Sequence, residues 1–94
     1  MSLTFEWDER KASDNLKKHS VSFSGASTVF ADPLSRTIDD PLHSVEEERF
    51  VVLGESSLQH LLVVVHSYVG NTIRIISARS ATARERKDYE RGKE

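Results

Sequence analysis

The sequence predicts a small α+β domain, in which a small antiparallel sheet has two N-terminal helices packed on one face and a further helix at the C-terminus. Three observations predict it. Helical patterns fill residues 8–31, and strand patterns follow over residues 34–79. A Gly70-Asn71 turn joins the two most apolar strands, which is typical of an antiparallel hairpin. The chain has 94 residues, enough for one domain over residues 1–94 and too few for a second.

The chain opens with a short strand over residues 3–7, where apolar residues alternate with polar ones. We expect Trp7 in the core, because tryptophan brings a large apolar area. Asp8 has the side chain of a helix N-cap, and the helix that it starts should end near His19.

A second helix is predicted to start at Ser22, another residue with a capping side chain. Phe23, Ala26 and Phe30 then recur at helical spacing and form one apolar stripe. Pro33 ends this helix, because the residue before a proline avoids the helical region of backbone space.

Strands should follow at residues 35–39, 49–53, 60–68 and 72–78. Both faces of the last two are apolar, which predicts that both are covered, one by the helices and the other by a partner. A final helix starts at Thr82, where Glu85 completes a capping box. Ala83 and Tyr89 are its only apolar anchors, so we expect it to dock weakly.

The composition excludes several classes of protein. There is no cysteine, so disulfide scaffolds, thiol catalysis and cysteine-bound zinc are excluded. The longest apolar run, residues 61–65, is far too short to span a membrane, and the N-terminal residues lack the basic and apolar parts of a signal peptide. We therefore expect a cytoplasmic protein.

Charge is unevenly distributed along the chain, although the net charge is only −2. Residues 31–60 hold two basic and seven acidic side chains, and residues 71–94 hold seven basic and four acidic ones. A near-neutral total argues against a protein that coats DNA with positive charge. It still permits a local basic patch, which is sufficient to bind a phosphate group.

Common sequence signatures of enzymes are absent. The chain has no glycine loop for phosphates or dinucleotides, no H-E-x-x-H zinc motif and no serine in a G-x-S-x-G elbow. Asp39, Asp40 and His43 have the side chains of metal ligands, but they lie next to Pro41, where aspartate ordinarily forms turns. We therefore expect no metal site there.

Histidine and arginine remain as candidates for catalysis, in the pattern that a metal-free ribonuclease needs. Such an enzyme uses a base for the ribose 2′-hydroxyl, an acid for the leaving oxygen and cations for the phosphate. Histidine suits the proton transfers, and the planar arginine fork suits the phosphate. The candidates are Lys18, His19, Arg49, His66, Arg74 and Arg79.

Strand alternation limits how these residues can meet. A regular strand would put Arg74 and Arg79 on opposite faces, so only one of them would share a face with His66 unless the site lies at a strand end. Ordinary structural roles are also open: His66 as a half-buried histidine, His19 as a cation at a helix C-terminus, Lys18 on a solvated face and Arg74 extended along the sheet.

Several segments together resemble a known family. The most specific are Phe5-Glu6-Trp7-Asp8 and Arg74-Ile75-Ile76-Ser77-Ala78-Arg79. Between them lie Lys18-His19, Phe30-Ala31-Asp32-Pro33, Glu48-Arg49-Phe50 and Val65-His66. With these segments the chain resembles the BrnT family of toxins from bacterial type II toxin–antitoxin systems, over nearly its whole length.

The resemblance implies a fold and an activity. BrnT proteins are similar in fold to RelE-type toxins, a compact antiparallel sheet with helices on one side, and they cut RNA and halt translation and growth. A ribbon-helix-helix antitoxin, BrnA, would neutralise this chain, and DNA would be reached only through the antitoxin. No metal or organic cofactor is implied. The family motif covers Lys18, His19, Arg49, His66, Arg74 and Arg79 without showing which of them transfers protons.

The first hypothesis is a metal-independent endoribonuclease toxin. His19 or His66 would be the acid or base, Arg49 and Arg79 would hold the phosphate, and Lys18 and Arg74 would support them. The alternative is a non-catalytic protein-binding module whose open sheet face docks a partner. A third idea, direct DNA binding by the C-terminal helix, is opposed by the acidic residues interleaved with its basic ones.

Overall fold

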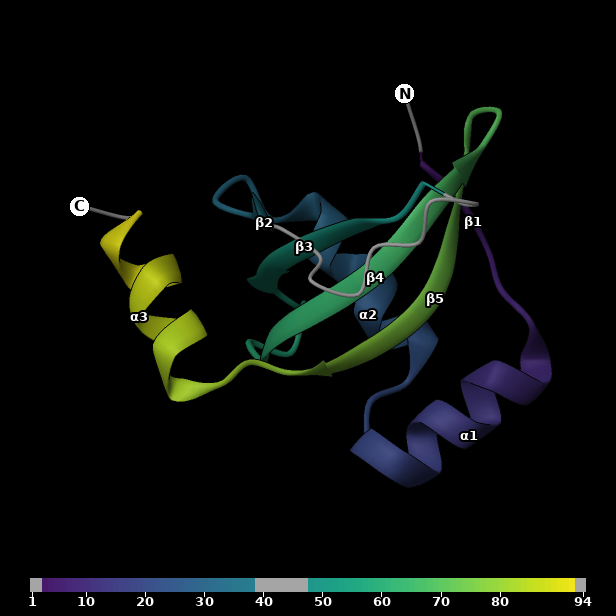
Figure 1. Ribbon diagram of the computed structural model, residues 1–94, viewed down its shortest axis with the longest axis horizontal. Helices are drawn as coiled ribbons and strands as arrows, with labels where there is room; N and C mark the ends of the chain where they lie inside the picture. Colours follow the sequence, from purple (N-terminus) through teal and green to yellow (C-terminus); the bar gives the residue numbers. More distant parts are fainter. Residues whose placement is uncertain (1–2, 39–47, 93–94) are drawn as a thin grey trace.

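The computed structural model describes residues 3–38 and 48–92, and its elements follow the predicted order along the chain (Figure 1). They are β1 (Thr4–Glu6), α1 (Glu9–His19), α2 (Phe23–Ser27), the 3-10 helix η1 (Thr28–Ala31), β2 (Arg36–Ile38), β3 (Phe50–Glu55), β4 (Leu61–Val69), β5 (Thr72–Ser80) and α3 (Ala83–Arg91). No helix within these ranges is long and apolar enough to cross a membrane. Asp39, Asp40 and His43, considered above as metal ligands, lie outside the described residues.

The predicted helix N-caps are confirmed. Asp8 accepts hydrogen bonds from two backbone amides in the first turn of α1, and Ser22 accepts one in α2. Thr82 and Glu85 form the capping box that starts α3. The second predicted helix is divided into α2 and η1, and η1 ends before Pro33 as predicted.

One sheet holds all five strands of the described residues, in the order β1-β5-β4-β3-β2. β2, β3, β4 and β5 pair antiparallel, as predicted, whereas β1 lies parallel to β5. The predicted antiparallel pairing therefore holds for four strands and fails at this edge. Turn residues in a sequence predict pairing only between strands that follow one another along the chain. β1 pairs instead with β5, the last strand, so its pairing could not be predicted from turn residues.

The face of the sheet that packs against α1, α2 and η1 is called the helix face. Its core joins Val52, Val64 and Ile75 of the sheet to Phe23 and Ala26 of α2. In Figure 1, α2 lies behind β4 and β5, across the middle of this face. Burying these side chains is the main contribution of the helices to the stability of the fold.

The opposite side of the sheet is called the α3 face, because α3 covers part of it. Tyr89 of α3 packs over Leu53 and Val63 and is only 4% exposed. Its hydroxyl donates a hydrogen bond to Asp32 Oδ2 at 2.6 Å, and burial next to this carboxylate raises the pKa of Tyr89. The helix expected to dock weakly thus has one well-buried anchor, and where it lies the chain itself, rather than a partner, covers the second face.

A β-bulge in β5 interrupts its pairing with β4. Val65 pairs with Ser77, but the next residue of β4, His66, pairs with Ile75. Ile76 is therefore an additional residue that has no place in the regular register.

The bulge decides which arginines share a face. Arg74 pairs with Ser67, and Arg79 pairs with Val63. Ser67 and Val63 are four residues apart on β4, so both arginines lie on the α3 face, away from His66. The expectation that alternation separates Arg74 from Arg79 is wrong, because it assumes a strand without an inserted residue.

The side-chain amide of Asn15 closes the outer edge of β5 beyond the end of β1. Its Nδ2 donates hydrogen bonds to the backbone oxygens of Val21 and Ala78, both at 2.9 Å. Its Oδ1 accepts one from the backbone nitrogen of Ala78 at 3.1 Å. Asn15 is 7% exposed, so the amide replaces a neighbouring strand away from water and fixes α1 against β5.

Candidate active site

A groove follows the outer edge of β5, between that strand, β1 and α1, and is called the β5-edge groove. It consists of two hollows of about 350 and 200 Å³ that share Lys11 and Ile76 as lining residues. The predicted site residue Arg74 lines the first hollow, and Lys18 and His19 line the second. The remaining lining residues are Glu6, Trp7, Asp8 and Ile75 in the first hollow and Asp14, Asn15 and Ser77 in the second.

Helical spacing places three functional side chains along one side of the groove. Lys11, Asn15 and Lys18 are separated by four and three residues in α1, so they lie on one face of the helix, and His19 follows at its end. Because Asn15 is bonded to Ala78 of β5, that face is held toward the strand. The groove therefore has one fixed wall, on which Lys11, Lys18 and His19 lie beside Asp8 and Asp14.

Arg74 projects from the opposite wall and is held by Glu6. Glu6 and Arg74 are register partners on neighbouring strands, and Arg74 Nε donates to Glu6 Oε2 at 2.7 Å. The Arg74 side chain is 51% exposed and that of Glu6 is 39% exposed, so water screens the ion pair. The pair therefore adds little to the stability of the fold. Its effect is to orient the guanidinium at the mouth of the groove.

Arg49 lies directly before β3 and outside its strand pairing. One further step of the β3–β4 register would set it opposite Ser67, the partner of Arg74, on the α3 face. Two strand spacings, about 10 Å, would then separate the backbones of the two arginines. The structure thus brings Arg74 and Arg79 to one face of the sheet, and an extension of the β3 register would add Arg49 to them.

Arg79 makes a bidentate ion pair that joins the end of β5 to α3. Its Nη1 and Nη2 donate to Glu85 Oε1 and Oε2 at 2.8 and 2.9 Å. This hydrogen bonding lowers the pKa of Glu85 to about 2 and raises the pKa of Arg79. Glu85 is also the capping-box residue of α3, so Arg79 is bonded to the start of that helix.

Arg79→Ala and Glu85→Ala should each lower the free energy of unfolding by about 1 kcal/mol, and the double variant should lose less than the sum. The value is small because the Arg79 side chain is 42% exposed and solvent screens the pair. Urea unfolding of the parent and the three variants measures the coupling. Additive losses would show that the two side chains do not interact in solution.

His66 lies apart from the other predicted site residues, on the helix face. It is 4% exposed, and its ring lies edge-on to Phe30 with the centroids 4.7 Å apart. The rings of Phe50 and Tyr68 also contact the His66 ring. Burial lowers the pKa of His66, and a hydrogen bond between Nδ1 and the Val64 oxygen at 3.2 Å opposes this in part.

Replacing His66 with phenylalanine should reduce the loss of stability at acidic pH. The unfolded chain takes up a proton on this imidazole near its ordinary pKa of 6.5, whereas burial resists protonation in the folded protein. The parent's free energy of unfolding should therefore fall as the pH drops below 6.5, and His66→Phe should lack this part of the fall. Urea unfolding at about pH 7.5 and about pH 5.5 measures the difference.

His60→Gln is the matched control for this experiment. His60 is exposed and lies directly before β4, so this variant should keep the parent's dependence on pH. An equal fall in stability for the parent and for His66→Phe would mean that the folded protein accommodates a charged imidazole at His66.

Lys11 and Trp7 line the groove but were not predicted as site residues from the sequence. Lys11 resembles any other exposed lysine of an amphipathic helix. Trp7 packs against the core, as expected, but it is only half-buried and also lines the groove beside Arg74. Its position between the end of β1 and the N-cap Asp8 is the signal that could have placed it at a rim.

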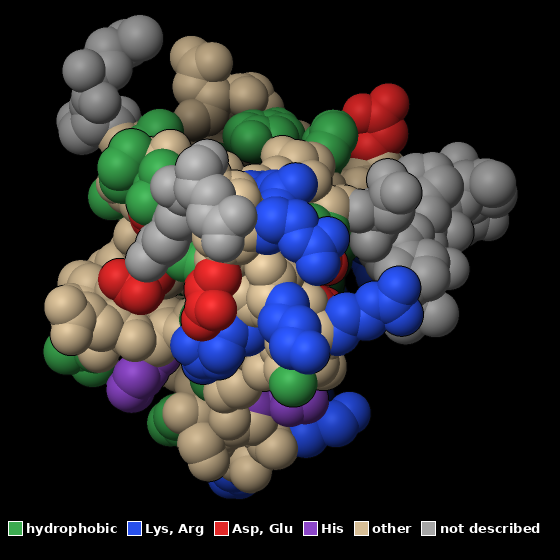
Figure 2. All heavy atoms as spheres, turned by 90° about the vertical axis from the view of Figure 1, so that its left-hand side faces the viewer, with side chains coloured by type: hydrophobic (Ala, Val, Ile, Leu, Met, Phe, Trp, Pro, Cys, Tyr) green, Lys and Arg blue, Asp and Glu red, His purple; other side chains and the backbone are tan. Residues whose placement is uncertain are grey.

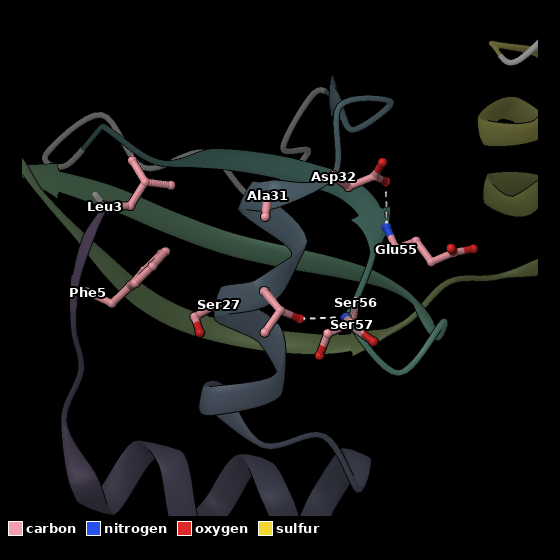
Figure 3. A pocket seen from close by; sticks show the side chains of 9 residues that line it. Leu3, Phe5, Ser27, Ala31, Asp32, Glu55, Ser56 and Ser57 are labelled. Atoms are coloured by element: carbon pink, nitrogen blue, oxygen red, sulfur yellow. Dashed lines mark hydrogen bonds between the residues drawn. The ribbon is translucent and has the colours of Figure 1, made fainter. Parts of the chain in front are cut away.

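A larger hollow of about 710 Å³ lies between β1, η1 and the end of β3 (Figure 3). Its ionisable side chains, Asp32 and Glu55, are both acidic, and Leu3, Phe5 and Ala31 make it partly apolar. None of the predicted site residues lines it, and its carboxylates would repel a phosphate. Within residues 3–38 and 48–92, no three metal-ligating side chains gather to hold an ion.

Lys and Arg side chains also gather on the side of the molecule that carries α3, with acidic side chains beside them (Figure 2). Arg84, Arg86 and Lys87 are exposed along α3, and so are Asp88 and Glu90. The helix surface is therefore of mixed charge, unlike the uniformly basic surfaces that bind DNA directly.

Taken with the fold, the groove defines a small α+β protein with a cleft of mixed charge, which brings Lys11, Lys18, Arg74 and the His19 imidazole together with three carboxylates. A family described as the ribonuclease toxin BrnT of type II toxin–antitoxin systems matches residues 7–85. The chain therefore belongs to the BrnT family of ribonuclease toxins, and the resemblance seen in the sequence is confirmed.

A solved structure supports the same fold. The crystal structure of the Brucella abortus ribonuclease toxin BrnT is similar to this chain with a TM-score of 0.66 and 23% sequence identity. The similarity covers 86% of this chain and 99% of the Brucella chain. No curated protein matches the chain.

Proposed function

We propose that this chain is a metal-independent endoribonuclease, the toxin of a type II toxin–antitoxin pair, and that it cleaves RNA in the β5-edge groove. One observation carries the proposal. Lys18, His19 and Arg74, three of the residues covered by the family motif, line a single groove. With Lys11, the groove offers three cations and one imidazole, which are the groups that phosphate binding and proton transfer require, and it also holds the carboxylates of Glu6, Asp8 and Asp14.

In this mechanism His19 accepts the proton of a ribose 2′-hydroxyl, and the 2′-oxygen attacks the adjacent phosphorus. The bond from phosphorus to the 5′-oxygen breaks, and that oxygen takes a proton from water in the open groove. The products are a 2′,3′-cyclic phosphate and a 5′-hydroxyl end.

The cations of the groove stabilise the negative charge that builds on the phosphate in the transition state. Arg74 donates through a planar fork, and Glu6 holds this fork in one orientation. Lys11 and Lys18 act as point charges from the opposite wall. Positioned donors of this kind are worth more than mobile ones, because they need no reorganisation during the reaction.

The other three predicted site residues take different roles in this proposal. Arg49 binds a flanking phosphate, since an extension of the β3 register would set it on the α3 face with Arg74. The predicted phosphate role of Arg79 is tested by the variants above: a greater loss of RNA cleavage in Arg79→Ala than in Glu85→Ala would support it. His66 is 4% exposed, packs against Phe30 and is not among the lining residues of the groove, so it does not reach RNA bound there.

We further propose a ribbon-helix-helix antitoxin as the protein partner, with DNA contacted only through that antitoxin. Membership in a family of type II toxins supports an antitoxin partner. RNA cleavage by this chain would inhibit translation, so the toxin would act in the cytoplasm and its expression should stop growth.

RNA cleavage by the purified chain in the presence of EDTA tests the proposed function. We expect the cleavage activity to follow the protein through purification and to persist in EDTA. The cut RNA should carry 2′,3′-cyclic phosphate ends. The assay should include naked RNA and translating ribosomes. Absence of cleavage in both, together with tight binding to an antitoxin helix, would favour the alternative of a non-catalytic module.

A further inference from the structure

Trp7 is the one indole or phenyl ring among the lining residues of the β5-edge groove. It is half-buried, so part of the ring is accessible to a ligand. Its inner side packs edge-on against Phe23, with the ring centroids 6.1 Å apart and the planes at 78°. Arg74 and Lys11 line the same hollow.

The backbone on both sides of Trp7 is fixed. Glu6, the residue before it, is paired with Arg74 through the β1–β5 ladder and the ion pair. Asp8, the residue after it, is the N-cap of α1 and is bonded to the first turn of that helix. The contact with Phe23 fixes the ring itself. A rigid aromatic ring beside phosphate-binding cations is the arrangement that proteins use to bind single-stranded nucleic acids.

We propose that Trp7 stacks on an RNA base next to the scissile phosphate and so positions the nucleotide for cleavage. This inference rests on the proposed function of the groove. The base must be unstacked from its neighbours to reach the ring, so the substrate at this point is single-stranded RNA. Stacking on an aromatic ring accepts every base, so Trp7 selects for an unpaired base rather than for one sequence.

Fluorescence provides a direct readout, because Trp7 is the only tryptophan of the chain. Titration with a single-stranded 2′-deoxy oligonucleotide, which lacks the attacking hydroxyl, should quench the tryptophan emission. The same length of abasic oligonucleotide presents the phosphates alone and should leave the emission unchanged. Anisotropy of labelled oligonucleotides measures binding independently. Binding with equal quenching by both ligands, or with none, would overturn the stacking role.

Variants then separate stacking from packing. Trp7→Leu should raise KM for RNA by about 5- to 150-fold with little change in kcat, whereas Trp7→Phe, which keeps a ring, should lose far less. Urea midpoints of the two variants should be similar. Tyr68→Leu, at a 55% exposed tyrosine outside the groove, is the matched control and should keep the parent KM.

The outcomes distinguish this inference from the proposed function. Equal KM values for Trp7→Leu and Trp7→Phe, with cleavage by the parent intact, would overturn the stacking role and leave the ribonuclease. Absence of cleavage by the parent would remove the proposed function, and the stacking role with it.

Discussion

Replacing His19 with glutamine should slow RNA cleavage by about 10²- to 10⁴-fold, the usual contribution of a positioned general base. Glutamine keeps a polar side chain at the end of α1 but does not accept a proton near neutral pH. Binding of a non-cleavable oligonucleotide and the urea midpoint should stay close to those of the parent, because Lys11, Lys18 and Arg74 remain in the groove. Single-turnover cleavage at saturating protein measures the chemical step.

His60→Gln is the matched control, since His60 is exposed and lies outside the groove. It should cleave RNA at the parent rate. If His19→Gln also cleaved at the parent rate, His19 would take no part in proton transfer. Cells that express His19→Gln should grow, whereas cells that express His60→Gln should stop growing as with the parent.

Replacing Asn15 with aspartate should lower the free energy of unfolding by about 3 kcal/mol or more at neutral pH. The two side chains have nearly the same shape, but the carboxylate cannot donate. The backbone oxygens of Val21 and Ala78 would lose their hydrogen bonds and would face a buried negative charge. Urea unfolding at about pH 7 measures this loss.

The same variant should recover part of its stability in acid. Burial among carbonyl oxygens raises the pKa of the introduced carboxyl above its value in the unfolded chain. The destabilisation is therefore complete above the folded pKa and declines as the pH falls through it, because the protonated group can donate one bond again. Asn71→Asp in the exposed hairpin turn is the control and should show neither effect. Equal stability of Asn15→Asp and the parent at neutral pH would contradict the edge-closing role of Asn15.

Local features of the sequence were sufficient to predict most elements of the fold. Asp8, Ser22 and the Thr82–Glu85 box mark helix starts through bonds to residues within one turn, so the information is contained in a few neighbouring positions. The strand predicted over residues 49–53 shows where this fails, because β3 continues through Gly54 to Glu55. A β-carbon at Gly54 would lie 2.7 Å from Val29 Cγ1, so the glycine allows η1 to pack on the sheet.

The candidate site depended on information that is not local. Helical spacing relates Lys11 to Lys18, but nothing in that spacing shows that α1 lies along β5. That contact is made by Asn15 and Ala78, which are far apart in the sequence. The family resemblance named Arg74 as well, but only the structure places it across the groove from α1.

Arg74 and Arg79 are separated by an odd interval, whereas residues on one side of an unbroken strand are separated by even ones. When two residues at an odd separation lie on the same face of a strand, the strand must contain an inserted residue between them. That residue, Ile76, borders both hollows of the groove, so the strand bends where the two meet. Shortening the strand there by one residue would leave the remaining side chains on their present sides and would straighten the rim that shapes the cleft.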